Sequence, residues 1–384
     1  MPMTFEKKYT RPTVAEVDLS AIAFNFRQVV ERVKPAKVMA VVKANAYGHG
    51  AVPVSKILLE NGADYLGVAL VEEGIALREA GIRAPILVFG LPLPNTLEQY
   101  YQYDLSCTVC AREHVEWISV MSDRMGKKIH CHLKVDTGMG RVGIPFGEAV
   151  SFVKRMESDS NIHLEGLYTH FATSDMEDKS FAHAQLKRFR EIIESLEQEG
   201  VYISMKHAAN SGAILDMPET FFDMVRPGVM LYGYYPSAET SESLSLRPAM
   251  RLKTRVSFVK KLPKDFSVSY GRTYVSDEET MIATLPIGYA DGYNRLFSNR
   301  GEVIIRGVRY SVVGRVCMDM TMVNVGPNSS VQVGDEAVLL GAQGEKTIEM
   351  TDVCRKLNTI PYEVTCWISE RVPRIYVHDE VNDV

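Results

Sequence analysis

Lys43 stands where a lysine is uncommon, directly after the unbroken apolar run of residues 38–42 (VMAVV). Such a run is typical of a strand that is buried on both faces. A lysine at its end can extend its amine to solvent at the rim of the fold. If the amine is instead partly buried, its pKa falls and it becomes a nucleophile near neutral pH. Amines of this kind form Schiff bases with carbonyls, and pyridoxal phosphate is their common partner.

Two further segments carry residues that a pyridoxal phosphate site requires. In AANSG (208–212), Ser211 and the backbone N–H groups of an expected helix start suit a phosphate. In VRPGVMLYG (225–233), Gly228 permits a close backbone approach and Arg226 is expected to point into the site. Each also has a simpler interpretation, Ser211 as a helix cap and Arg226 as a surface or ion-paired arginine. Only their combination with a strand-end lysine favours a cofactor site.

The elements that must position these residues alternate between strand and helix about eight times. The expected strands are residues 37–43, 64–70, 84–90, 105–109, 128–136, 163–171, 204–210 and 221–233. The expected helices are residues 18–33, 51–62, 71–81, 96–103, 111–126, 146–158, 181–200 and 211–217. The strands are continuous apolar runs, as in a parallel sheet that is covered on both faces. Because no GxGxxG motif is present, the pattern favours a closed (β/α)8 barrel of the α/β class over an open sheet.

Polar residues stand at the ends of several of these expected strands, as Lys43 does. They are Lys134, His170, His207 with Asn210, and Arg226. In a (β/α)8 barrel, catalytic residues collect at the carboxyl ends of the strands. The sequence therefore predicts a site at this end of the barrel.

The pattern changes near residue 236, where PSAETSESLSLRPA (236–249) has the composition of a linker. Mostly strands are expected after it, together with one short helix at residues 350–359. We therefore predict a barrel domain at residues 14–238 and a mainly-β domain at residues 239–384, with residues 1–13 packing against the second domain.

Composition and charge exclude several classes of protein. The 384 residues are 46% hydrophobic and 24% charged, which is usual for a globular protein. The net charge of −5 gives no general attraction for nucleic acid or for an anionic membrane surface. No apolar run approaches the roughly 20 residues of a membrane span. The first residues, MPMTFEKKYTRP, carry charge and proline where a signal peptide needs an apolar core, so we do not expect export.

The cysteines and histidines give weaker signals. Cys107 and Cys110 form a CxxC motif without a second pair, so buried or partly buried thiols are expected rather than a metal or redox centre. His130 and His132 share one side of an expected strand, and a packed or solvent-facing pair is favoured over metal binding. Both expectations fit a reducing, cytoplasmic compartment.

Nine segments in this order make the chain similar to the bacterial alanine racemases over residues 13–374. They are AVVKANAYGHG, LKVDTGMGRVG, GLYTHFATSD, HAANSGA, VRPGVMLYG, VSYGRTYV, PIGYADG, GRVCMDM and NTIPYE. The resemblance implies an isomerase with a pyridoxal phosphate barrel and a C-terminal β domain. It also implies a homodimer in which each barrel is capped by the partner's β domain, and a product, D-alanine, that supplies peptidoglycan synthesis.

The resemblance further implies roles for individual residues. Lys43 would hold the cofactor and act as one catalytic base, while Tyr270 would be the base on the opposite face. The cofactor would be bound by Tyr47, His170, Ser211, Arg226, Gly228, Val229 and Tyr362. The substrate would be bound by Arg141 and Met318, with Tyr289 and Tyr362 narrowing the access channel and Asp175 and Arg295 further out. Lys134 matches a lysine that many members carry as a carbamate.

The chemistry of racemisation accounts for these residue types, because it removes the α-proton from one face and returns one on the other. Arg226 has five N–H donors and a pKa above about 12, so it donates to a ring nitrogen without protonating it. A pyridoxal phosphate decarboxylase of the same plan would be expected to use an acidic residue there. That decarboxylase, a racemase acting on serine or on a broader range, and a non-enzymatic cofactor carrier remain as alternatives.

Overall fold

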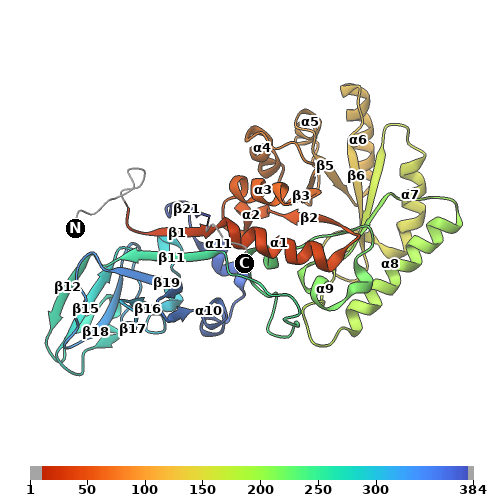
Figure 1. The fold of residues 1–384 in the computed structure, drawn as a ribbon. Helices are drawn as coiled ribbons and strands as arrows, with labels where there is room; N and C mark the ends of the chain where they lie inside the picture. Colours follow the sequence, from red (N-terminus) through yellow and green to blue (C-terminus); the bar gives the residue numbers. More distant parts are fainter. Residues whose placement is uncertain (1–10, 379–384) are drawn as a thin grey trace. The chain divides into compact units, whose positions relative to one another are not determined.

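The computed structural model describes residues 11–378, and these residues form two compact units (Figure 1). One unit comprises residues 21–247, and the other comprises residues 11–20 together with residues 248–378. The chain leaves the first unit within the segment 236–249 that was expected to be a linker. The predicted domain limits of 14–238 and 239–384 remain predictions.

In the unit of residues 21–247, eight of the described strands form a closed parallel ring. They are β2 (Lys37–Val41), β3 (Tyr65–Val68), β4 (Ile86–Val88), β5 (Ser106–Val109), β6 (His130–Asp136), β8 (His163–Tyr168), β9 (Met205–His207) and β10 (Met224–Val225). The order is β5-β4-β3-β2-β10-β9-β8-β6, and pairing of β5 with β6 closes the ring. The short strand β7 (Ile144–Pro145) pairs with β6 outside it. The predicted (β/α)8 barrel is confirmed.

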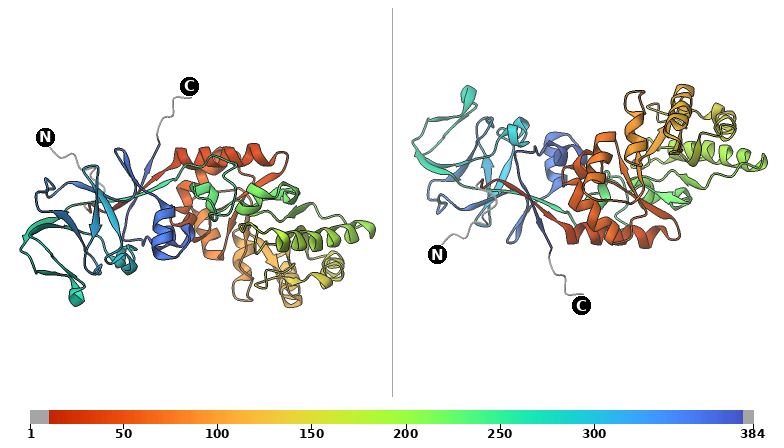
Figure 2. Two further views of the ribbon diagram at one scale, coloured as in Figure 1. Left: turned by 90° about the horizontal axis from the view of Figure 1, so that it is seen from below. Right: turned by 90° about the horizontal axis from the view of Figure 1, so that it is seen from above.

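The helices of this unit lie outside the strand ring (Figures 1 and 2). They are α1 (Leu19–Val33), α2 (Lys43–Tyr47), α3 (Ala51–Glu60), α4 (Val71–Glu79), α5 (Leu97–Gln102), α6 (Arg112–Met125), α7 (Ala149–Glu157), α8 (Ser180–Gln198) and α9 (Ser211–Asp216). All but the short α2 were predicted, and α1 was predicted from apolar residues that recur with the helical period. None of the helices in residues 11–378 combines the length and hydropathy of a membrane span.

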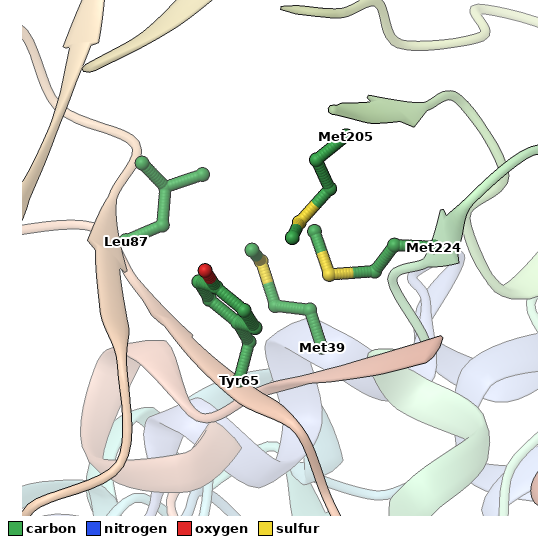
Figure 3. Packing of buried hydrophobic residues seen from close by; sticks show 5 residues of the cluster. All are labelled: Met39, Tyr65, Leu87, Met205 and Met224. Atoms are coloured by element: carbon green, nitrogen blue, oxygen red, sulfur yellow. The ribbon is translucent and has the colours of Figure 1, made fainter. Parts of the chain in front are cut away.

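Side chains fill part of the barrel interior, so the ring is a packed core and not a channel. Five buried residues from five strands form one cluster there (Figure 3). They are Met39, Tyr65, Leu87, Met205 and Met224. Three of the five are methionines, whose flexible side chains fit an irregular space between larger neighbours.

The second unit is built on one large sheet. Its strands are β1 (Val14–Asp18), β11 (Met250–Arg255), β12 (Phe258–Leu262), β15 (Thr280–Leu285), β16 (Glu302–Ile305), β17 (Val308–Val312), β18 (Thr321–Gly326), β19 (Glu336–Gln343), β20 (Lys346–Ile348) and β21 (Arg374–Val377). The order is β12-β15-β18-β17-β16-β19-β11-β1-β21, and β20 pairs with β19. The first strand, β1, is antiparallel to β11 and parallel to β21. This confirms the mainly-β C-terminal fold.

The prediction of a single short helix in this unit is wrong. Besides α10 (Met350–Leu357), the unit has a second helix, α11 (Pro361–Trp367), which was not predicted from the sequence. Proline is favoured in the first turn of a helix, because its missing N–H would have no intrahelical partner there. Pro361 at the start of α11 was therefore a usable signal for this helix.

The two cysteines of the CxxC motif and the two histidines of the predicted pair differ in burial. Cys107 is buried and Cys110 is partly buried, both as free thiols, in agreement with the prediction. His132 is fully buried, and His130 lies closer to solvent. Both histidines contact the same carboxylate, that of Glu165.

Candidate active site

Lys43 lies at the start of a tight turn, because β2 ends two residues earlier than the strand predicted for residues 37–43. Residues 44–47 all have φ of 52° to 53°, which is the left-handed region. This conformation costs roughly 1–2 kcal/mol for each residue other than glycine. Hydrogen bonds hold the turn, among them one of 2.8 Å from the N–H of Ala46 to the carbonyl oxygen of Val42. The turn leaves Lys43 half-buried at the carboxyl end of β2.

Arg226 is buried directly after β10, and its guanidinium is held by the barrel. Its Nη1 donates to His207 Nδ1 at 2.9 Å. Its Nη2 donates to the carbonyl oxygens of Thr169 and Ala208 at 2.7 and 3.0 Å, and lies 3.4 Å from His170 Nδ1. These four acceptors leave at least one of its five N–H groups for a ligand atom. Burial lowers the pKa of Arg226 to about 10, so the group stays charged near neutral pH.

Two hydroxyl groups and a backbone N–H meet at Gly228. The Gly228 N–H donates to Ser211 Oγ at 2.9 Å. A Cβ on Gly228 would lie 2.6 Å from Tyr47 Oη, so a larger residue would displace the tyrosine. Ser211 does not cap α9, because the Asn210 side chain accepts from the N–H of Ala213 at 3.1 Å and fills that role. The simpler interpretation of Ser211 as a helix cap is therefore wrong.

Four cationic side chains act on one another at this end of the barrel. Burial and, after it, the charges of Arg141, Arg226 and Lys43 together lower the pKa of Lys134 to about 8. A concentration of positive charge suits an anionic ligand.

Two aromatic residues from the end of β8 complete this part of the site. Burial, followed by the charge of Arg226, lowers the pKa of His170 well below its usual value, so the ring is neutral. The ring of Tyr168 faces two cations, with Lys134 Nζ 5.5 Å and Arg226 Cζ 5.3 Å from its centroid. Sequence reasoning missed Tyr168, although its place directly before the THF motif at a strand end was a usable signal.

The other predicted residues belong to the second unit. Tyr270 lies in a turn between the paired strands β13 (Ser267–Val268) and β14 (Tyr274–Val275), and 72% of it is exposed. The turn is fixed by Ser269, whose hydroxyl donates to the Arg315 carbonyl oxygen at 2.6 Å. The phenol of Tyr270 thus faces solvent next to an anchored residue of the turn.

Tyr289 and Met318 are neighbours in the second unit, because the N–H of Ala290 donates to the Met318 carbonyl oxygen at 3.0 Å. Both side chains are exposed. Tyr289 also lines a pocket of about 350 Å³ together with Arg295. Tyr362 lies on α11, and it is half-buried.

Comparison with known families and structures covers nearly the whole chain. The family model described as alanine racemase, N-terminal domain, matches residues 17–236, and the model for the C-terminal domain matches residues 249–376. A protein named alanine racemase 2, from Caldanaerobacter subterraneus subsp. tengcongensis, is 49% identical over 377 residues, or 97% of each chain.

Solved structures of alanine racemases are similar over the same extent. The enzyme of Clostridium difficile 630 is 38% identical, with a TM-score of 0.92 and 97% of each chain covered. The Bacillus anthracis enzyme with bound L-Ala-P is 40% identical, with a TM-score of 0.91 and coverage of 97% of this chain and 96% of that one.

Proposed function

Because the chain belongs to the alanine racemase family, we propose that it interconverts L-alanine and D-alanine with pyridoxal phosphate bound in its barrel unit. The observation that carries this proposal is the group of four cations at the carboxyl end of the barrel, in which the charges of Lys43, Arg141 and Arg226 lower the pKa values of both Lys134 and His170. An anionic cofactor with a carbonyl would be drawn to such a place.

The barrel residues fit pyridoxal phosphate. The hydroxyls of Tyr47 and Ser211 and the backbone around Gly228 suit its phosphate. The remaining N–H of Arg226 suits its ring nitrogen, and the neutral His170 lies beside that arginine. When bound, pyridoxal phosphate supplies an aldehyde that condenses with amines and a ring that withdraws electrons from the α-carbon. The residues proposed to hold it are Lys43, Tyr47, His170, Ser211, Arg226, Gly228, Val229 and Tyr362.

We assign the two proton transfers to Lys43 and Tyr270. Lys43 Nζ holds or moves the α-proton on one face of alanine, and Tyr270 Oη does so on the other. One group removes a proton and the other supplies one. Lys43 therefore ends a turnover in the protonation state in which Tyr270 began it, and Tyr270 ends it in the state in which Lys43 began. A positioned base of this kind contributes about 10²–10⁴-fold to the rate. Arg141 and the backbone of Met318 would hold the substrate carboxylate.

The arginine at position 226 argues against the decarboxylase alternative. A guanidinium donates to a ring nitrogen but does not transfer a proton to it, since its pKa stays near 10 even when buried. Racemisation also requires a second group that transfers a proton on the opposite face of the α-carbon, and the phenol of Tyr270 is proposed to be that group. Tyr289 and Tyr362 would limit the side chain of the substrate to a small one, which favours alanine over larger amino acids.

Incubating the purified protein and its cofactor with L-alanine in deuterated water tests this function. We expect D-alanine that carries deuterium at the α-carbon, with the two enantiomers approaching equal amounts. Chiral chromatography with mass detection measures both quantities. Absence of D-alanine would refute the proposal, and release of carbon dioxide from lysine or ornithine would support the decarboxylase instead.

Lys134 is proposed to carry a carbamate, because only a neutral amine reacts with carbon dioxide. With a pKa of about 8, roughly half of these amines are neutral at pH 8, against about 0.3% for an ordinary lysine. We expect a carbamate carbon signal in the ¹³C NMR spectrum of protein in ¹³C-bicarbonate, and expect it to weaken as the pH falls below 8. The Lys134→Arg variant is the control and should lack the signal. A signal of equal strength in that variant would contradict the assignment.

We propose that the active protein is a homodimer whose sites are shared between chains, since Lys43 and Tyr270 belong to different units. The exposed Tyr270, Tyr289 and Met318 would then face the partner's barrel.

We place this enzyme in the cytoplasm, where D-alanine is consumed in peptidoglycan synthesis. Its free cysteines suit a reducing compartment.

A further inference from the structure

Four residues form an unbroken line of hydrogen bonds through the interior of the barrel. Arg226 Nη1 lies 2.9 Å from His207 Nδ1, and His207 Nε2 lies 2.9 Å from His132 Nδ1. His132 Nε2 lies 3.0 Å from an oxygen of Glu165. The line starts directly after β10 and passes through β9 and β6 to β8. The proposed mechanism uses only its first member.

The chemistry of the two ends fixes every proton in the line. An arginine offers only donors, so His207 Nδ1 must accept and its proton must sit on Nε2. That N–H donates to His132 Nδ1, so the proton of His132 also sits on Nε2 and is donated to the Glu165 carboxylate. A second proton on either ring would set two donors against each other. Both histidines are therefore neutral, with one tautomer each.

Burial agrees with this assignment. Both imidazoles are fully buried, and burial is the largest cause that lowers the pKa of each. The ring of Tyr168 stacks on that of His207, with centroids 4.8 Å apart and planes within 5°. The histidine ring is thus held in its plane while its two nitrogens face fixed partners.

Glu165 ends the line as a charged acceptor. Burial would raise its pKa, but hydrogen bonds from His130, His132 and Tyr65 together lower it. Tyr65 Oη donates to the second carboxylate oxygen at 2.6 Å, and His130 Nδ1 lies 3.3 Å from the first. The carboxylate is therefore ionised and fully engaged, although it lies on a strand of an apolar barrel.

We propose that Glu165 is a positioning residue which, through His132 and His207, keeps a hydrogen-bond acceptor in front of Arg226. Aligned hydrogen bonds polarise and strengthen one another in a low-dielectric interior. Without the carboxylate, His132 would bury an unpaired N–H, which is costly. It avoids this cost only by moving its proton to Nδ1, and that forces the proton of His207 to Nδ1, opposite the guanidinium.

The proposal rests on the proposed function only where it concerns the cofactor. With the proton of His207 on Nδ1, Arg226 would turn or shift. Its remaining N–H would then no longer point toward the ring nitrogen of the cofactor. The line itself belongs to the chain alone, so its protons can be tested without cofactor.

The test is long-range ¹H–¹⁵N NMR of the full-length, cofactor-free protein labelled at its histidine nitrogens. In the unsubstituted chain we expect a protonated Nε2 and a bare Nδ1 for both His132 and His207. Glu165→Leu should move the His207 Nδ1 signal toward that of a protonated nitrogen. Glu165→Gln should leave it in place, because the amide oxygen still accepts from His132.

Tyr65→Phe is the matched control, since it removes a bond to Glu165 that lies outside the line, and it should leave His207 unchanged. A proton on Nδ1 of either histidine in the unsubstituted chain would overturn the proposal. So would a His207 signal that is the same in Glu165→Leu as in the unsubstituted chain. If Glu165→Leu does not fold, the tautomers of His132 and His207 in the unsubstituted and Glu165→Gln chains still test the proposed positions of the protons.

A second readout links the line to alanine turnover. With cofactor bound, we expect Glu165→Leu to lower kcat about ten-fold with KM changed less than about two-fold, and Glu165→Gln to restore kcat. An unchanged kcat for the folded Glu165→Leu protein would count against positioning. If the unsubstituted chain did not racemise alanine, the proposed function would fail, while the NMR result would still stand.

Discussion

The Lys43→Ala protein is expected to lose alanine racemisation by about 10⁴-fold or more, the largest effect of any single substitution proposed here. The same amine is proposed both to hold the cofactor and to move the α-proton, so both contributions disappear together. The barrel should remain intact, because the side chain is only half-buried and its loss leaves no large cavity. Racemisation assays measure the loss of activity, and thermal unfolding of the variant tests whether the barrel remains folded.

Borohydride reduction of the cofactor-loaded protein gives an independent check. Peptide mapping should find the reduced cofactor on the peptide that contains Lys43 and nowhere else. Lys56→Ala is a suitable control, because Lys56 is exposed on α3 and should affect neither activity nor labelling. A label on another lysine, or an active Lys43→Ala protein, would remove the basis of the proposed mechanism.

Mixing Lys43→Ala chains with Tyr270→Phe chains is expected to restore activity that neither variant has alone. If each site takes Lys43 from one chain and Tyr270 from the other, a hybrid dimer has one intact site and one site that lacks both residues. Random pairing makes half of the dimers hybrids, so the mixture should reach about a quarter of the activity of the unsubstituted protein. The measurement is racemase activity before and after subunit exchange.

The controls separate sharing of sites from other causes. Lys43→Ala chains exchanged with one another should stay inactive. Tyr274→Phe alone should stay active, since that hydroxyl binds Asn324 within its own unit and has no role in the proposed proton transfer. If hybrid dimers form, as mass spectrometry would show, but activity does not return, the sites are not shared between chains.

The barrel could be predicted from the sequence because its strands are short apolar runs at regular spacing. Residues 64–70 and 84–90, for example, contain β3 and β4 entirely, and the predicted helix between them contains α4. The limits of the strands were less accurate, since apolar residues continue past the last residue of a strand. Residue 42 is an example, because it is apolar and buried yet lies outside β2.

Local backbone conformation was beyond what the sequence reveals. Nothing in the composition of residues 44–47 predicts four successive left-handed residues, because only the hydrogen bonds of the folded turn compensate their cost. The direction of side chains was equally hidden. His207 was correctly placed at the end of a strand, but its ring is buried in the barrel and bonded to His132. Glu165 was overlooked, although a charge within the apolar run HLEGLY was a visible anomaly.

The pairing of β1 has a consequence for how the protein is made. This strand precedes the barrel strands in the chain, yet both of its neighbours, β11 and β21, follow them. The barrel strands are complete by residue 225, so the barrel can close while translation continues. The nascent chain must therefore carry β1 without a partner strand at least until β11, which ends at residue 255, has been made.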